Sequence, residues 1–310
     1  MEEKIEIMNL LQSKQVLEHE LQSLAYGSVE IRENESNKYI YVHYREDGVA
    51  LTKYVGEYSD ELYNLVLNNS IKAKQLKKQI REITKKLKQL NYTEEELSEK
   101  VEQNIDFAKR HLVDTIYKQA ILEGVATTFA DTESIIEGGK VNNMTSEDIL
   151  KIVNLKHAWE FILNKNVILS DTNFALLCEI NKMVEEGFYY TAGKVRNTPV
   201  TIGGTTWKPD LPIESVIKEE LEEIFNKELN DVDRAIEILL YTMKKQVFID
   251  GNKRTAVIYS NHYLISKGKG IIAIPAELTQ EFKDLLIPYY EGKDEDKIRE
   301  FIKEKCYMEI

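Results

Sequence analysis

The stretch KKQVFIDGNKRTA, residues 244–256, sets a glycine-containing loop directly before a predicted helix. Gly251 can take a positive φ, so the backbone amides of residues 251–253 can converge on one point where that helix begins. The positive end of the helix dipole and the guanidinium of Arg254 favour a phosphate there, and Asp250 offers an oxygen ligand for Mg²⁺. The loop therefore predicts a magnesium-nucleotide site, although the pentapeptide DGNKR alone is equally compatible with a solvated turn.

The chain around this loop predicts a mainly α domain. The preceding residues, 231–245, place Ile236, Leu239 and Met243 on one face of a buried helix, which gives the loop a rigid base. The segment NTPVTIGGTTWKP, residues 197–209, is the extended-looking piece of this part of the chain. The helical period also recurs at 108–124, 146–164, 171–187, 213–227, 252–267 and 278–290.

The first part of the chain predicts an α+β module. Apolar spacing indicates helices at 3–25 and 60–90. Between them, β-branched and aromatic residues alternate with charged ones, which is typical of a three-stranded meander with one turn at Asp47-Gly48.

The boundary between the two parts is predicted near residue 104. Thr93 and Glu96 have the spacing of a capping box, so a second helix is expected to follow the lysine-rich one as a helical hairpin. The apolar stripe changes character soon afterwards. We therefore expect an interaction module at 1–104 and the helical domain at 105–310.

Composition restricts the classes of function. A chain of 310 residues with 43% hydrophobic content can form two folded domains. It has no run of about 18 apolar residues and no signal-peptide layout, so we expect a cytoplasmic protein. The net charge of -12 argues against a general nucleic-acid binder. Cys178 and Cys306 are too few for a disulfide framework and lack neighbours at zinc-ligand spacing.

The loop motif resembles the signature of a known family. QVFIDGNKRTAV, residues 246–257, is similar to the pattern HxFx[D/E]GN[G/K]RxxR of the Fic (filamentation induced by cyclic AMP) family. GKVR at 193–196 and the extended segment after it resemble the family's Gly-x-x-Arg and flap hairpin, and ESIIEG at 133–138 resembles its inhibitory motif. The resemblance covers residues 118–295 and implies a helical Fic fold with a small β-hairpin flap.

This resemblance implies an enzyme that transfers AMP from ATP, with Mg²⁺, to a Ser, Thr or Tyr hydroxyl of a target protein. Asp250 would bind the metal, and Arg254 would hold a distal phosphate. Gly251, Asn252 and Lys253 would form the anion hole. The flap would align the target peptide by strand addition through Val200, Thr201, Ile202 and Gly203.

Three positions depart from the family pattern. Gln246 stands where the family has its catalytic histidine, and an amide cannot accept a proton near neutral pH. We therefore expect low activity, because a general base typically contributes about 10²- to 10⁴-fold. Lys253 replaces a common glycine and resembles the Doc (death on curing) branch, whose implied chemistry is phosphate transfer. Val257 replaces the arginine that would pair with the inhibitory glutamate, which leaves Arg254 as the partner that Glu137 could reach.

Alternative functions and partners stay open at this stage. The chain could be a Doc-like protein kinase or toxin, or a nucleotide-binding regulatory protein that has lost its chemistry. Its target is not identifiable, and a homo-oligomer is left open. The lysine-rich run 72–88 could contact nucleic acid or an acidic partner, although such a face is more often simply solvated.

Overall fold

The computed structural model describes residues 2–34, 37–46, 49–90, 92, 97–142 and 144–310. The contacts divide the chain into two compact units, Met1–Glu95 and Glu96–Ile310, which are described separately. In the described part of the chain, no helix is both long and apolar enough to cross a membrane.

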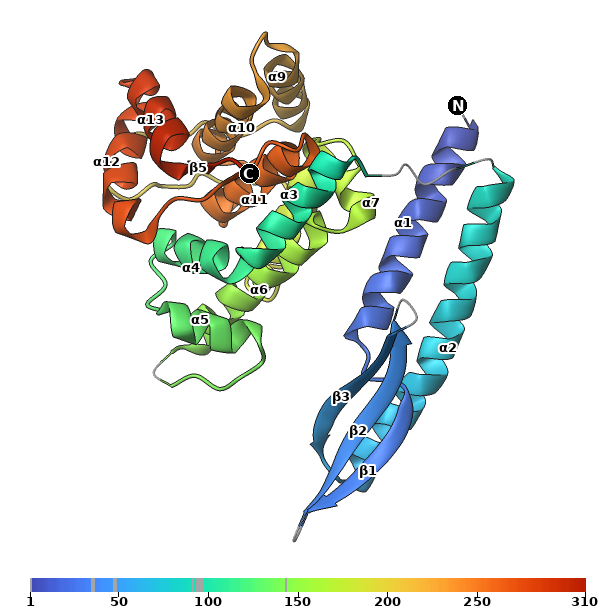
Figure 1. Ribbon diagram of the computed structural model, residues 1–310. Helices are drawn as coiled ribbons and strands as arrows, with labels where there is room; N and C mark the ends of the chain where they lie inside the picture. The colour runs from blue at the N-terminus through green and yellow to red at the C-terminus, as the bar shows by residue number, and fades with distance from the viewer. Residues whose placement is uncertain (1, 35–36, 47–48, 91, 93–96, 143) are drawn as a thin grey trace. The chain divides into compact units, whose positions relative to one another are not determined.

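The first unit is a pair of antiparallel helices with a three-stranded sheet at one end (Figure 1). The strands are antiparallel in the order β1-β2-β3, which confirms the predicted meander. Its predicted turn at residues 47–48 and the predicted capping box of Thr93 and Glu96 lie outside the described residues. The elements are α1 (Glu2–Ser23), β1 (Ser28–Asn34), β2 (Asn37–Glu46), β3 (Val49–Glu57) and α2 (Asp60–Gln89).

Alternation along β2 explains how the sheet packs. Ile40 and Val42 point to the same face and are fully buried against Val66 of α2. At the same end of the unit, Oγ of Ser70 lies 3.1 Å from both the amide nitrogen and the carbonyl oxygen of Gly27. The connection between α1 and β1 is thereby tied to α2.

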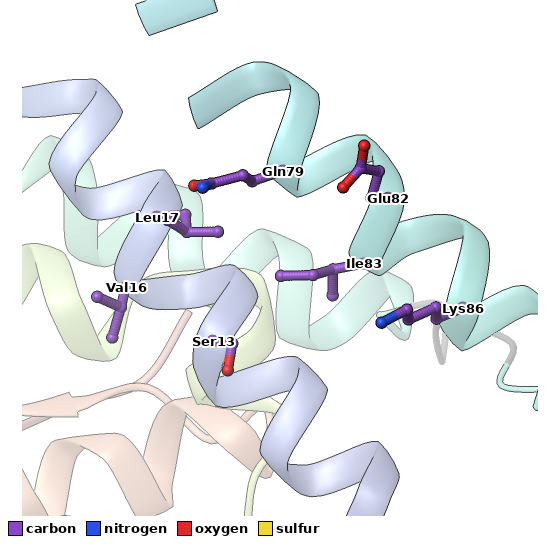
Figure 2. A pocket seen from close by; sticks show the side chains of 7 residues that line it. All are labelled: Ser13, Val16, Leu17, Gln79, Glu82, Ile83 and Lys86. Atoms are coloured by element: carbon purple, nitrogen blue, oxygen red, sulfur yellow. The ribbon is translucent and has the colours of Figure 1, made fainter. Parts of the chain in front are cut away.

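Further along the two helices, a groove of about 550 Å³ opens between α1 and α2. Figure 2 shows that side chains from both helices border it. Its lining is mixed, with apolar, neutral polar and charged groups: Ser13, Val16, Leu17, Gln79, Glu82, Ile83 and Lys86.

The second unit is helical, with a two-stranded antiparallel sheet. Its helices are α3 (Glu99–Arg110), α4 (Leu112–Leu122), α5 (Phe129–Ile136), α6 (Ser146–Ile162), α7 (Lys165–Ile168), α8 (Phe174–Val184), α9 (Glu214–Asn226), α10 (Asp231–Lys245), α11 (Asn252–Ser266), η1 (Ala276–Leu278), α12 (Thr279–Tyr290), α13 (Glu295–Phe301) and η2 (Ile302–Cys306). The sheet pairs β4 (Ile271–Ile272) with β5 (Tyr307–Met308).

Helix α11 runs through the centre of this unit beside α10 (Figure 1). From Asn252 to Ile265 it is buried at every position except Lys253, so it is surrounded by the rest of the fold. Asn261 bonds both the N–H and the C=O of Ile272, whereas Oη of Tyr259 has no hydrogen-bond partner among the described residues. His262 contacts Thr172 and the carbonyl of Val167, and burial lowers its pKa to about 4, so it stays neutral near pH 7.

Helix α3 belongs to the second unit. Ile105 and Ala108 lie in its core, and the amide of Gly270 donates to Oδ1 of Asn104. The predicted boundary at 104/105 would therefore cut through α3, whereas the contacts separate the units at residues 95 and 96. The helix predicted at 108–124 is also divided, because α3 ends and α4 begins at His111.

Candidate functional site

The site begins where α10 ends. Gln246 takes a left-handed backbone conformation there (φ 48°, ψ 57°), which is uncommon for a residue with a side chain. Its Nε2 donates to the carbonyl of Met243 at 2.6 Å, and its Oε1 accepts from Nδ2 of Asn252 at 3.2 Å. The residue at the histidine position is thus held by the end of α10 and by the loop that follows.

Asn252 closes the loop from the other side. Its Oδ1 accepts from the amide of Phe248 at 3.0 Å, and its Nδ2 donates to the carbonyl of Phe248 at 2.8 Å. The side chain is buried, so these bonds fix the loop in one shape. The side chain of Asn252 therefore stabilises the loop, and its backbone amide at the start of α11 is left to bind an anion.

Gly251 is the residue from which α11 starts. Its φ of 73° suits glycine, and a Cβ atom there would lie 2.3 Å from Oε1 of Glu185. The first amides of α11 have no partners within the helix, so an anion at this end is favoured. The side chain of Asp250 is 52% exposed beside them, and its Oδ1 accepts from the amide of Gly251 at 2.7 Å. The loop thus joins an anion site to an accessible carboxylate.

Arg254 lies in the first turn of α11, with a side chain only 3% exposed. Its Nη2 is 2.8 Å from Oε1 of Glu185, and its Nε is 3.5 Å from Oε2 of Glu123. Neither ion pair has the alignment of a hydrogen bond, because Oε1 of Glu185 and Nε of Arg254 have no hydrogen-bond partner among the described residues, and Nη1 of Arg254 has none either. Both nitrogens therefore remain donors that a phosphate oxygen could satisfy.

Glu123 follows the last residue of α4 and reaches two cations of the loop. Besides its contact with Arg254, it lies 3.4 Å from Nζ of Lys253. Its side chain is 11% exposed, so solvent screens these contacts weakly. One carboxylate thus engages both side-chain cations at the anion site.

Glu137, the residue expected to reach Arg254, lies elsewhere. It is exposed at the end of α5, and the carboxylates within 4 Å of Arg254 in the described structure are Glu123, Glu185 and Asp250. A sequence signal for Glu123 did exist, because LEG at 122–124 repeats the pattern of IEG at 136–138 directly after a helix.

Glu185, which the sequence reading missed, comes from the end of α8. It is 2% exposed, and burial raises the pKa of its carboxyl to about 7 although Arg254 acts to lower it. It continues the buried face of α8, lying four residues after Asn181 and eight after Leu177. That spacing can be read from the sequence, and it places Glu185 on the buried face of α8. It does not indicate that the partner of Glu185 is Arg254.

The segment expected to be the flap hairpin contains no strand, and it has a turn at residues 203–204. The buried guanidinium of Arg196 donates to the carbonyls of Thr198 (2.8 Å), Asp210 (2.6 Å) and Gln246 (2.6 Å). Because these bonds draw the two ends of the segment together at the start of the loop, side-chain contacts replace a strand ladder. The expected flap residues, Val200 to Gly203, lie within this closed segment.

Residues 171–264 match the Fic/DOC family model, and this range includes α8, the segment held by Arg196, α9, α10, the loop and most of α11. The chain carries a Fic/DOC domain. The match ends within α11, so helices on both sides of it complete the unit that holds the Fic/DOC domain.

Solved Fic structures have a similar fold. A Fic-1 fragment from C. elegans has a TM-score of 0.53 at 16% identity, covering 78% of this chain and 79% of its own. A Fic protein from Desulfovibrio desulfuricans has a TM-score of 0.52 at 12% identity, covering 68% and 73%. A Fic-domain signaling protein from Bacteroides thetaiotaomicron has a TM-score of 0.51 at 19% identity, covering 61% and 75%. At these identities the likeness establishes the fold, and no curated protein sequence matches the chain.

Proposed function

We propose that this protein binds ATP with Mg²⁺ at the Fic/DOC loop and transfers AMP slowly to a Ser, Thr or Tyr hydroxyl of a target protein. The observation that carries the proposal is the buried guanidinium of Arg254, two of whose nitrogens have no hydrogen-bond partner among the described residues. A buried donor left without a partner is costly, and phosphate oxygens satisfy a guanidinium well.

The metal fits the donors available. Within the described residues, no group of three or more His, Cys, Asp or Glu side chains could hold a metal ion. Mg²⁺ commonly binds one or two carboxylates together with substrate phosphates and water, so the exposed carboxylate of Asp250 is sufficient. The ion would neutralise phosphate charge during transfer.

The protein's own groups would then divide the work. The amides at the start of α11 and the guanidinium of Arg254 would hold the phosphates in one orientation. The segment held by Arg196 would present the target's backbone beside the loop. Gln246 would orient the incoming hydroxyl without taking its proton, because an amide does not accept a proton near neutral pH. Its contacts with Met243 and Asn252 use one N–H of Nε2 and one lone pair of Oε1, so one of each remains for the hydroxyl. The expected rate is therefore low.

We also propose that Glu123, rather than Glu137, restrains this site. Its carboxylate engages Lys253 and Arg254 at distances of 3.4 and 3.5 Å, so a phosphate must compete with it for both cations.

Lys253 supports a second candidate, Doc-like transfer of phosphate. Its Nζ lies beside the same carboxylate as Arg254, which adds a cation to the site where many AMP-transferring relatives have glycine. Two cations at this point could hold ATP in the orientation that presents its γ-phosphate.

The test compares the protein with its Gln246→His variant, each incubated with cell lysate, Mg²⁺ and ATP labelled on either the α- or the γ-phosphate. A positioned base should raise transfer by about 10²-fold or more. Label from the α-phosphate on protein supports AMP transfer, and label from the γ-phosphate alone supports the Doc-like reaction. A Gln246→His/Asp250→Ala double variant serves as the inactive control. If ATP binds but neither AMP nor phosphate is transferred, the proposed enzyme activity would be wrong and the protein would be a nucleotide-binding regulatory protein.

A further inference from the structure

One side of α2 carries a regular row of cations. Residues 72–88 contain eight Lys or Arg and one carboxylate, Glu82, a net charge of +7 in a chain whose net charge is -12. Five of these cations recur at intervals of four and three residues, so they share one face of the helix. They extend over about 21 Å at 1.5 Å per residue. These residues form the basic stripe: Lys74, Lys78, Arg81, Lys85 and Lys88.

The basic stripe is free of the packing of its own unit. All five residues are exposed, and the buried positions Ala73, Leu76 and Leu87 lie on another side of α2. Among the described residues, its ion pair is Lys78 with Glu82 at 4.0 Å, on two strongly exposed side chains. An exposed pair of this kind contributes little.

Two of the three cations outside the stripe behave differently. Lys72 lies 2.5 Å from Glu20 of α1, and Nζ of Lys77 lies 4.6 Å from the centre of the Tyr26 ring. These two residues therefore contact other parts of their own unit. The stripe does not, and its like charges, one helical turn apart, repel each other. Such a row is favourable once an anionic surface covers it.

We propose that the basic stripe binds the phosphate backbone of a nucleic-acid duplex without reading its sequence. A duplex carries one negative charge per about 1.7 Å of axis, so a row of about 21 Å faces enough phosphates for all five cations. Four of the five are lysines, which act as point charges and need no particular base edge.

The flanks of the stripe favour a duplex over a membrane or a protein surface. A helix that lies on a membrane places apolar residues beside its basic face. Here the neighbouring positions on one side are Gln75, Gln79 and Glu82. Between Lys74 and Lys88, α2 exposes no large apolar residue of the kind that anchors protein interfaces, and its exposed apolar residues, Leu65, Leu67 and Ile71, precede the stripe. At about 0.1 M salt the screening length is about 10 Å, so charges that lie farther than this from the stripe do not cancel its local charge.

The test measures binding of the full-length protein to fluorescein-labelled DNA and RNA duplexes of unrelated sequences, by anisotropy over a series of salt concentrations. Five phosphate contacts predict that log K falls with log salt at a slope of about -4.5. Replacing all five stripe residues with Gln should weaken binding by at least about 100-fold at low salt. Glutamine keeps a helix propensity close to that of Lys and Arg, and circular dichroism checks the fold.

The matched control replaces five exposed lysines of the second unit with Gln and should leave affinity within about twofold, since phosphate contacts are local. Those lysines are Lys140, Lys165, Lys227, Lys267 and Lys269. If the variant with all five substitutions does not fold, the single variants Lys78→Gln and Arg81→Gln are measured instead. Each should reduce the magnitude of the slope of log K against log salt by about 1.

Three results would overturn the inference. The first is absence of duplex binding by the unmodified protein, and the second is an equal loss in the stripe and control variants. The third is stripe-dependent binding to phosphatidylserine vesicles with no binding to either duplex, which would assign the surface to an anionic membrane.

Discussion

Nη2 of Arg254 lies 2.8 Å from Oε1 of Glu185, a carboxylate that is almost completely buried beneath the anion loop. The same guanidinium faces Glu123 at 3.5 Å on its other side. Arg254 is therefore held between a buried carboxylate from α8 and a less buried one from the end of α4. These two partners differ in what their removal should do.

Replacing Glu123 with Gln should strengthen Mg-ATP binding, because phosphate would no longer compete with a carboxylate for Lys253 and Arg254. We expect a gain of about tenfold in affinity, equivalent to about 1.4 kcal/mol, measured by calorimetry. Glu137→Gln is the control and should bind as the unmodified protein does, because Glu137 is exposed at the end of α5. Equal gains in both variants would contradict the assignment of Glu123.

Replacing Glu185 with Gln should change how stability depends on pH. Burial raises the pKa of Glu185 from 4.5 to about 7, so between these values the native state holds a proton that the unfolded state releases. The contribution of Glu185 is therefore full below about pH 4.5 and is lost as the pH rises through about 7. Glutamine does not titrate. Relative to the unmodified protein, the free energy of unfolding of Glu185→Gln should rise by up to about 3 kcal/mol between about pH 5 and about pH 8.

Urea unfolding at the two pH values measures this difference. Glu186→Gln is the matched control, because Glu186 is the exposed neighbour of Glu185. A Glu185→Gln variant whose stability difference is the same at both pH values would show that burial does not control this carboxyl.

Replacing Arg196 with Met should release the segment after it. The substitution removes donors to the carbonyls of Thr198, Asp210 and Gln246 while keeping an apolar chain of similar length. Limited proteolysis should then cut between residues 197 and 212 at least about tenfold faster, because cleavage follows local opening. Lys194→Met, at an exposed position nearby, should be cut at the original rate. Unchanged cleavage in Arg196→Met would mean that other contacts hold the segment.

Two fragments should differ in stability although their first residues are only eight positions apart. A fragment of residues 97–310 keeps all of α3, whereas one of residues 105–310 loses half of it, including the bond from Gly270 to Asn104. We expect the longer fragment to fold and the shorter one to be less stable by at least about 1 kcal/mol, the usual net contribution of one hydrogen bond. Thermal unfolding compares them, and equal midpoints would place the boundary where the sequence suggested.

The sequence predicted the fold well where both ends of an element were marked. The helices at 231–245 and 252–267 agree with α10 and α11 to within one residue, since each has a clear start and stop signal. The break at His111 was not readable, because the apolar period continues across it. Helix α5 was not predicted, because it is short and overlaps the stretch ESIIEG that resembled the inhibitory motif.

The site was predictable along the loop and not across it. The sequence brings residues 250–254 together by adjacency, so their grouping needs no tertiary information. Glu123 and Glu185 approach Arg254 from helices that lie 131 and 69 residues away in the chain. Only packing of α4 and α8 around α11 makes them neighbours, and periodicity alone does not specify which faces meet.

The burial of α11 has a consequence for how the site could admit a ligand. From Asn252 onward the helix is enclosed, and Asn261 and His262 bind it to β4 and to the region around α7. Its first turn cannot shift without disturbing the core, so the loop that precedes it keeps one conformation. Any adjustment to molecules of different size must come from two neighbouring parts of the chain, the end of α4 and the segment held by Arg196. Selectivity would then reside in parts of the chain that contribute nothing to the signature motif.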